Sequence, residues 1–150
     1  MKTVDQTEAQ QTIKKADPCV IVIFGAAGDL TKRLLMPALY NLAVRNLLPT
    51  EFAIVGVARA EMSTEDFRSK MTQEIHEFAT VPVDDGVWQN FEKRLYYQAA
   101  NFQDAETYSK LKKLLEQVDS ECKTQGNCLF YLATAADYFG DIINQLGSAG

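Results

Sequence analysis

The sequence has 150 residues, of which 47% are hydrophobic and 23% are charged, and its formal net charge is −5 at pH 7. These values are ordinary for a soluble globular protein and match a single domain with a sizeable core. The negative charge argues against a nucleic-acid binder, which needs a basic face to neutralise phosphates. A single local positive site for a small anionic ligand remains compatible with it.

The first 17 residues are polar and rich in Gln, Thr and Lys, and Pro18 ends any helix before the first apolar run. We expect a polar N-terminal lead over residues 1–17, either disordered or a short frayed helix, and a domain over residues 18–150. The chain does not start with a signal peptide, and no apolar run reaches membrane-spanning length. These features predict a soluble, cytoplasmic protein with no membrane partner.

Residues 19–24 form an apolar run typical of a central strand in a parallel sheet, and a glycine-containing turn follows. The spacing becomes helical over residues 29–46, where Pro37 should divide a short first turn from a longer second helix. The expected apolar side of this stretch consists of Leu34, Leu35, Ala38, Leu39 and Leu42.

Strands and helices alternate along the rest of the chain. We expect strands at residues 52–58, 95–100 and 128–133, and helices at about residues 64–78, 85–94, 104–122 and 137–146, with Ser63 as an N-cap. This order predicts an α/β fold with a doubly wound, Rossmann-like, mostly parallel sheet and helices on both faces. Ligands of such sheets bind at the carboxyl ends of the strands, where Gly25 and Arg59 should meet.

The turn after the first strand has the spacing Gly-x-x-Gly, at Gly25 and Gly28. Gly25 allows a sharp turn, and Gly28 lets the backbone approach a pyrophosphate at the positive end of the helix. The common dinucleotide motif Gly-x-Gly-x-x-Gly is incomplete, because Ala27 and Leu30 occupy its other glycine positions. The turn is therefore either a phosphate site or purely structural, and Asp29 is expected to cap the helix.

Arg59, at the end of the second predicted strand, favours the phosphate interpretation. In a dinucleotide fold, a carboxylate at this place accepts the 2′-hydroxyl of NAD, whereas an arginine suits the 2′-phosphate of NADP. The first acid, Glu61, comes two residues later. The alternative is a solvated arginine at a strand end. Lys32 and Arg33 either reach a phosphate or are solvated on the first helical turn.

The aromatic residues near the fourth strand allow two interpretations. They either line a nicotinamide pocket or belong to the core: Phe130, Tyr131, Tyr138 and Phe139. The single histidine, His76, is expected on the surface of a helix. The cysteines are odd in number and form no Cys-x-x-Cys pair, so we expect reduced, mostly buried thiols and no metal site.

Four segments carry a family resemblance. They are Gly-Ala-Ala-Gly-Asp-Leu-Thr-Lys-Arg at residues 25–33, Leu-Met-Pro-Ala-Leu-Tyr-Asn-Leu at 35–42, Ile-Val-Gly-Val-Ala-Arg at 54–59 and Leu-Phe-Tyr-Leu-Ala at 129–133. The chain resembles the N-terminal, coenzyme-binding domain of the glucose-6-phosphate dehydrogenase family. The resemblance implies that NADP contacts Gly25, Ala26, Ala27, Gly28, Asp29, Leu30, Thr31 and Lys32, with Arg59 on its 2′-phosphate.

The resemblance also implies that Asn101 and Phe102 lie on the adenine or ribose side of the cofactor and that Tyr131 lies near it. This chain departs from the family at three places. Leu34 stands where a third basic residue is common, Ala135-Ala136 stand where the family usually has Pro-Pro, and Asn101 replaces a commonly acidic residue.

The family's activity is hydride transfer from C1 of glucose 6-phosphate to NADP⁺, the first step of the pentose phosphate pathway. Its substrate segment Glu-Lys-Pro-Phe-Gly and its histidine base fall beyond residue 150, so we expect a fragment with no catalytic residue, inactive alone. The parent is expected to be a homodimer or homotetramer. The alternative is a non-catalytic NADP-sensing module.

Overall fold

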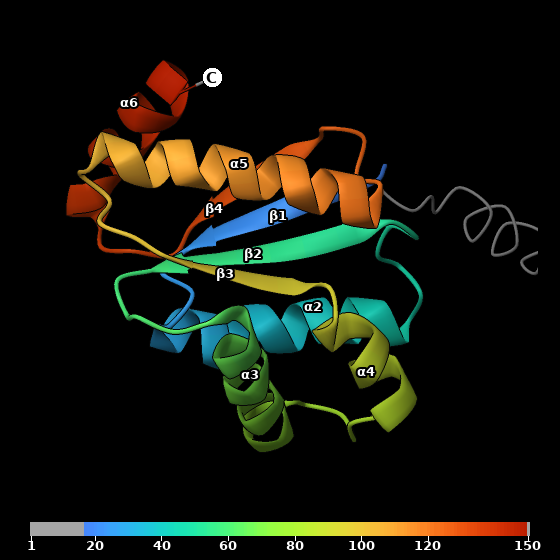
Figure 1. Cartoon of the computed structure of the whole chain (residues 1–150). Coiled ribbons are helices and arrows are strands. Elements are labelled where there is room, and N and C mark those ends of the chain that lie inside the picture. The colour runs from blue at the N-terminus through green and yellow to red at the C-terminus, as the bar shows by residue number, and fades with distance from the viewer. Residues whose placement is uncertain (1–16, 150) are drawn as a thin grey trace, which may run out of the picture.

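The computed structural model describes residues 17–149; most of the expected polar lead therefore lies outside the described residues. Four parallel strands form one sheet in the order β3–β2–β1–β4. Their bounds are β1 Cys19–Phe24, β2 Phe52–Ala58, β3 Leu95–Ala99 and β4 Cys128–Leu132. Helices α2, α3 and α4 cover one face, and α5 and α6 lie on the other (Figure 1). The predicted α/β parallel architecture is confirmed.

The helical elements follow the predicted alternation closely. They are the π-helical segment η1 Thr31–Leu35, α2 Met36–Val44, α3 Thr64–Phe78, α4 Asp85–Glu92, α5 Ala105–Cys122, the 3₁₀ segment η2 Ala136–Tyr138 and α6 Phe139–Ala149. Ser63 Oγ accepts from the backbone N–H of Asp66 at 3.0 Å, which confirms the predicted N-cap. The last helix is the exception: a 3₁₀ turn precedes it, and it begins at Phe139 and ends at Ala149, later than predicted.

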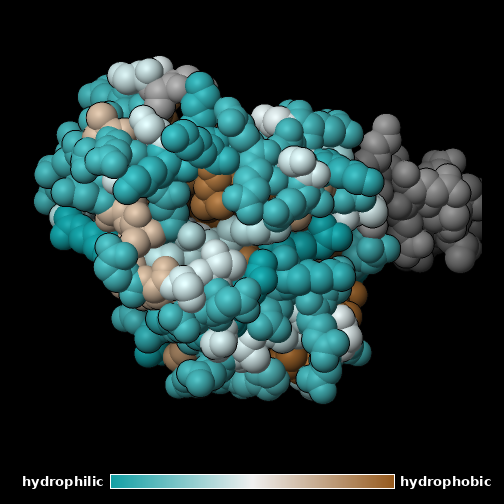
Figure 2. Space-filling view, in the orientation of Figure 1, coloured by the Kyte–Doolittle hydropathy of each residue, from teal (hydrophilic) through white to brown (hydrophobic). Residues whose placement is uncertain are grey.

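The two central strands are buried on both faces, as expected for a parallel sheet. Alternate residues enter different cores because side chains of a strand point to opposite faces. Ile21 and Ile23 of β1 pack with α2, α3 and α4, whereas Val20, Val22 and Phe24 pack with α5 and α6. The face that Figure 2 presents is mostly hydrophilic.

The expected apolar side of the first helical stretch was correct only in part: Leu39 is buried and Leu35 packs against the core, but Leu34, Ala38 and Leu42 are exposed. The buried residues of α2 are Met36, Pro37, Leu39 and Tyr40, whereas Leu34 is 63% exposed and Leu42 is 38% exposed. The cause is the π-helical turn before Pro37, where the N–H of Met36 donates to Thr31 O. A π turn contains one residue more than an α turn, so it shifts the helical face that follows.

The thiols are free, but they are less buried than expected. Cys122 is buried, Cys19 is half-buried and Cys128 is exposed. His76 is exposed on α3, as predicted.

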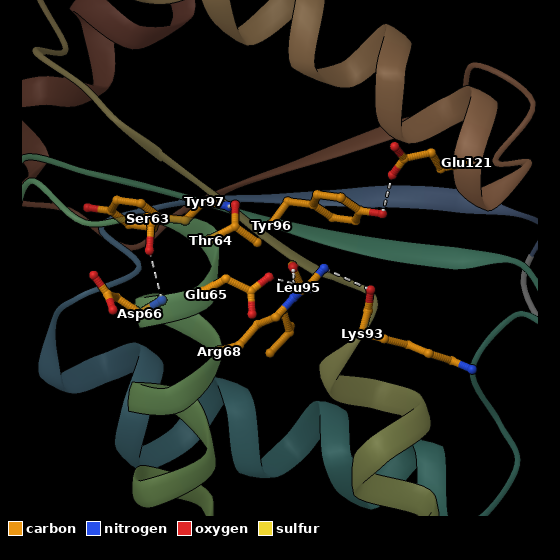
Figure 3. A network of polar contacts seen from close by, with 10 residues as sticks. All are labelled: Ser63, Thr64, Glu65, Asp66, Arg68, Lys93, Leu95, Tyr96, Tyr97 and Glu121. Atoms are coloured by element: carbon orange, nitrogen blue, oxygen red, sulfur yellow. Dashed lines mark hydrogen bonds and ion pairs between the residues drawn. The ribbon is translucent and has the colours of Figure 1, made fainter.

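The β3 edge of the sheet is closed by side chains of α3 (Figure 3). Thr64 Oγ1 accepts from the N–H of Tyr97 at 3.2 Å, and Arg68 Nε donates to Leu95 O at 2.8 Å. The opposite edge, β4, exposes Leu129 and Tyr131 at 57% and 40%. Side-chain hydrogen bonds therefore occupy backbone groups at the β3 edge, where an unpaired strand would present free donors and acceptors.

Candidate functional site

The carboxyl ends of three strands meet at one side of the sheet. Gly25 follows β1, Arg59 follows β2 and Ala133 follows β4. The N–H of Gly25 donates to Val57 O at 2.8 Å, and the N–H of Ala133 donates to Phe24 O at 2.8 Å. The ladder bonds of the sheet thus hold these three positions together, as the parallel topology predicts.

Gly25 has a conformation that only glycine adopts without strain. Its φ is +92°, and a Cβ at this position would lie 2.4 Å from Ala133 O. The backbone N–H of Gly28 donates to Gly25 O at 3.0 Å, and Thr31 Oγ1 donates to the same oxygen at 3.2 Å. Thr31 is fully buried, so its hydroxyl serves the turn itself. The predicted sharp turn is confirmed and is fixed from two sides.

Gly28 is the open part of the turn. The nearest heavy atom to a Cβ built there is Gly25 O, at 3.3 Å. The helix that begins after Gly28 has no side-chain cap at Leu30. The N–H of Lys32 donates to Gly28 O at 3.3 Å, whereas the N–H groups that precede it in a first turn have no partner within the helix and can face an anion at its positive end.

Asp29 does not cap the helix, contrary to expectation. Its carboxylate is 77% exposed and forms ion pairs with Lys32, at 3.2 Å, and Arg33, at 3.9 Å. The spacing of three and four residues places these side chains on one helix face. Both cations also lie against the ring of Phe78 at the end of α3, with Arg33 at 4.7 Å from the ring centroid. The Lys32 ammonium therefore already contacts Asp29 and the Phe78 ring.

A hollow of about 270 Å³ joins the glycine turn to the end of β2. Its lining residues are Gly25, Ala27, Gly28, Ala58, Arg59, Ala60, Phe102 and Ala133. A larger hollow of about 560 Å³ lies beside the end of β3 and the start of α5, and Arg59 lines both. The structure thus brings together the glycine turn and the arginine that the sequence placed 34 positions apart, at residues 25 and 59.

Arg59 is exposed, and its guanidinium contacts Tyr138. Its Nη2 donates to the Tyr138 hydroxyl, and its Cζ lies 4.7 Å from the centroid of the Tyr138 ring. No carboxylate of residues 17–149 forms an ion pair with it. Most of the five guanidinium donors are therefore available to a ligand.

The loop after Arg59 is anchored by Tyr97. The Tyr97 hydroxyl donates to Ala60 O at 2.6 Å. Burial raises the pKa of Tyr97, and the nearby Glu61 carboxylate raises it further. The hydroxyl consequently stays protonated as a donor at neutral pH and fixes the backbone one residue beyond Arg59.

The four remaining predicted site residues lie in four different environments. Phe102 is 4% exposed and lines the smaller hollow, whereas Asn101 is exposed and lines the larger one. Asn101 Oδ1 accepts from the N–H of Gln103 at 3.0 Å. Ala26 is buried behind the turn, and Tyr131 is on the exposed β4 edge and lines neither hollow.

Tyr138 is one of the aromatic residues for which the sequence allowed two positions, a nicotinamide pocket or the core. The structure packs it against the core beside Phe102 and also places it against Arg59. Two further observations concern residues 17–149. They contain no group of three or more His, Cys, Asp or Glu side chains placed to hold a metal ion. No helix in this part of the chain combines the length and apolar character needed to cross a bilayer.

Comparison with known proteins places this geometry in a family. Residues 22–150 match the family model described as glucose-6-phosphate dehydrogenase, NAD binding domain. The chain is 49% identical over 140 residues to glucose-6-phosphate 1-dehydrogenase of Chlamydia muridarum, covering 93% of this chain and 28% of the relative. It is 46% identical over 129 residues to the same enzyme of Chlamydia pneumoniae, covering 86% of this chain and 25% of the relative.

Similar solved structures are also glucose-6-phosphate dehydrogenases. A glucose-6-phosphate dehydrogenase in complex with its substrate glucose-6-phosphate matches with a TM-score of 0.78 and 33% identity, covering 91% of this chain and 28% of that one. Glucose-6-phosphate 1-dehydrogenase from Mycobacterium avium matches with a TM-score of 0.73 and 28% identity, covering 89% of this chain and 28% of that one. The chain thus spans little more than a quarter of the length of these relatives. It belongs to the family of glucose-6-phosphate dehydrogenase NAD-binding domains.

Proposed function

We propose that this chain binds NADP at the carboxyl edge of β1 and β2. The observation that carries the proposal is the single hollow that Gly25, Gly28 and Arg59 line together. The pyrophosphate would lie over the backbone of residues 25–30, including Ala26, Ala27 and Asp29, at the uncapped helix start. The 2′-phosphate would bind Arg59.

The donor set around Arg59 supports NADP over NAD. An NAD site places a carboxylate at the end of the second strand to accept the 2′-hydroxyl. Here the residues on both sides of Arg59 are Ala58 and Ala60, and Glu61 lines the larger hollow but not the smaller one. A guanidinium with free donors and no paired acid suits a phosphate dianion.

The other cofactor contacts are proposals of unequal support. Phe102 and Asn101 line the hollows on either side of Arg59, which supports their place on the adenine or ribose side. The N–H of Leu30 belongs to the uncapped first turn, and Thr31 acts through the turn it stabilises. Lys32 and Tyr131 line neither hollow, so their contacts rest on the resemblance alone.

We propose further that the whole protein is a glucose-6-phosphate 1-dehydrogenase of the cytoplasm that acts as a homodimer or homotetramer. Its reaction transfers a hydride from C1 of glucose 6-phosphate to NADP⁺, and the proton of the C1 hydroxyl passes to a base. Bound NADP⁺ would supply the hydride acceptor, and the residues of this chain would bind and orient it. The non-catalytic sensing module is not favoured, because the relatives with this domain are named as dehydrogenases.

Binding of NADP⁺ to Gly28→Ala, measured by calorimetry, tests the placement of the cofactor. The new methyl group meets only Gly25 O, at 3.3 Å, so the fold should survive while the approach of the pyrophosphate is blocked. The matched control is Gly147→Ala, where a Cβ meets nothing within 4 Å. We expect loss of about tenfold or more in affinity for Gly28→Ala and none for the control. Equal affinity in both variants, or no binding by the unmodified chain, would contradict the proposal.

A further inference from the structure

Tyr138 and Arg59 form a contact that the cofactor proposal does not use. The two residues are 79 positions apart, and the guanidinium both donates to the phenol oxygen and lies over the aromatic ring. Tyr138 is the last residue of η2, where its own N–H donates to Ala135 O at 3.1 Å. A short, hydrogen-bonded turn thus brings one ring to the rim of the site.

The ring of Tyr138 is itself fixed by a series of aromatic contacts. Its neighbour is Phe102, at 5.6 Å between centroids and an interplanar angle of 75°. Phe102 packs edge-on against Phe24, the last residue of β1, at 5.8 Å and 70°. The Tyr108 hydroxyl donates to Phe102 O at 2.6 Å. Edge-to-face pairs of this kind are the favoured arrangement of aromatic rings, so the position of Tyr138 follows from the buried core.

A fixed ring changes what a ligand must do at Arg59. A free arginine side chain has many rotamers. A ligand that immobilises the side chain binds more weakly, because the lost conformational entropy opposes binding. The cation–π contact and the phenol hydrogen bond restrict Arg59 before the ligand arrives. The phenol oxygen accepts from Nη2, so the remaining guanidinium donors stay available.

We propose that Tyr138 is a positioning residue that holds the guanidinium of Arg59 ready for the 2′-phosphate and so contributes to the preference for NADP⁺ over NAD⁺. This inference rests on the proposed function, because it assigns Tyr138 an effect only through a phosphate on Arg59. It concerns specificity between two nucleotides and assigns Tyr138 no contact with the reacting atoms.

Affinities of NADP⁺ and NAD⁺ for Tyr138→Ala, measured by calorimetry, test it. We expect the NADP⁺ affinity to fall about fivefold while the NAD⁺ affinity stays the same, because NAD⁺ has no 2′-phosphate. Tyr138→Phe keeps the ring against Phe102 and loses the hydroxyl, so it should restore part of the loss. In an Arg59→Ala background, Tyr138→Ala should have no further effect on NADP⁺ affinity.

Three results would overturn the inference. An equal loss of affinity for both nucleotides would show a structural role, and a gain of NADP⁺ affinity would show that the ring competes with the ligand for Arg59. An undiminished effect of Tyr138→Ala in the Arg59→Ala background would show that Tyr138 does not act through Arg59. If Tyr138→Ala does not fold, Tyr138→Phe provides the test. If Tyr138→Phe has the same ratio of NADP⁺ to NAD⁺ affinity as the unmodified chain, the inference is overturned equally.

Failure of the cofactor proposal can be told apart from failure of this inference. If the unmodified chain binds neither nucleotide, or binds NADP⁺ and NAD⁺ with equal affinity, the cofactor proposal is wrong. In that event the role of Tyr138 in nucleotide preference is refuted with it. If the unmodified chain clearly prefers NADP⁺ and Tyr138→Ala has the same ratio of NADP⁺ to NAD⁺ affinity, only the positioning role of Tyr138 is refuted.

Discussion

Two arginines of this domain lie against tyrosine rings, yet their other contacts differ. Arg68 lies 5.4 Å from the ring centroid of Tyr96, and Arg59 lies 4.7 Å from that of Tyr138. Arg68 donates to Leu95 O at 2.8 Å and to Lys93 O at 3.0 Å (Figure 3), and it also pairs with Glu65 at 3.4 Å. Arg59 donates to the Tyr138 hydroxyl.

This difference separates a structural arginine from the arginine that we propose to bind the cofactor. The guanidinium of Arg68 is occupied by two backbone carbonyls and a carboxylate, and its side chain is only 20% exposed. Removing it takes this donor away from Leu95 O at the β3 edge and from Lys93 O at the end of α4. Arg59 is exposed at the rim of a hollow and has donors to spare. Both arginines thus contact an aromatic ring, and the donors that remain unoccupied distinguish the structural arginine from the one that we propose to bind a ligand.

Replacing Arg68 with alanine should have the largest effect on folding. Loss of two charge-assisted hydrogen bonds should lower the free energy of unfolding by about 2–3 kcal/mol, with no change in the NADP⁺ affinity of the folded protein. Urea denaturation measures the first quantity and calorimetry the second. The matched change Arg59→Ala should alter the unfolding free energy by less than about 0.5 kcal/mol, since that side chain is exposed. Similar losses of stability in both variants would remove the distinction.

Replacing Tyr96 with phenylalanine should have a smaller, pH-dependent effect. The Tyr96 hydroxyl donates to Glu121 Oε2 at 2.7 Å, and this hydrogen bond, followed by one from Gln117, holds the pKa of Glu121 below its ordinary value of 4.5. A lowered carboxyl pKa stabilises the fold above the ordinary value, and that stabilisation is lost as the pH falls through the lowered one.

Thermal unfolding between about pH 6 and pH 3 measures this effect. The unmodified chain should lose stability more steeply below about pH 4.5 than Tyr96→Phe, and the two curves should approach each other at the acid end. The difference at neutral pH should be about 1 kcal/mol or less, as for one exposed hydrogen bond. Parallel curves over the whole range would show that Glu121 does not depend on Tyr96.

Replacing Glu61 with glutamine should have the smallest effect. Glu61 and Arg59 line the same larger hollow, so the carboxylate repels a phosphate bound at Arg59. We expect about a twofold gain of NADP⁺ affinity at low ionic strength that disappears at high salt. The control is Glu65→Gln, whose carboxylate pairs with Arg68 at 3.4 Å and should leave NADP⁺ affinity unchanged. A gain that persists in high salt would point to a cause other than charge.

Local chemistry made much of this fold predictable. The bounds of β1 and β2, the Ser63 cap and the sharp turn at Gly25 follow from residue types within a few positions of one another. The pairing of Asp29 with Lys32 and Arg33 was equally local, and the three- and four-residue spacing would have indicated it.

Other features depend on the folded chain. The π turn before Pro37 shifts the buried face of α2, and apolar spacing alone does not reveal an inserted residue. The contact of Arg59 with Tyr138 joins residues 79 positions apart, and it exists because η2 follows β4 at the same end of the sheet as β2. Both residues are singled out by the sequence, but their contact is not predictable from it.

The ratio of NADP⁺ to NAD⁺ affinity in Arg59→Ala tests the central claim most directly. Arg45→Ala, which removes an exposed arginine at the end of α2, is the matched control. A charge-assisted phosphate contact of about 1.5–3 kcal/mol predicts that the ratio falls about tenfold to a hundredfold in Arg59→Ala and stays unchanged in the control. An unchanged ratio in Arg59→Ala would contradict the assignment of the 2′-phosphate to Arg59.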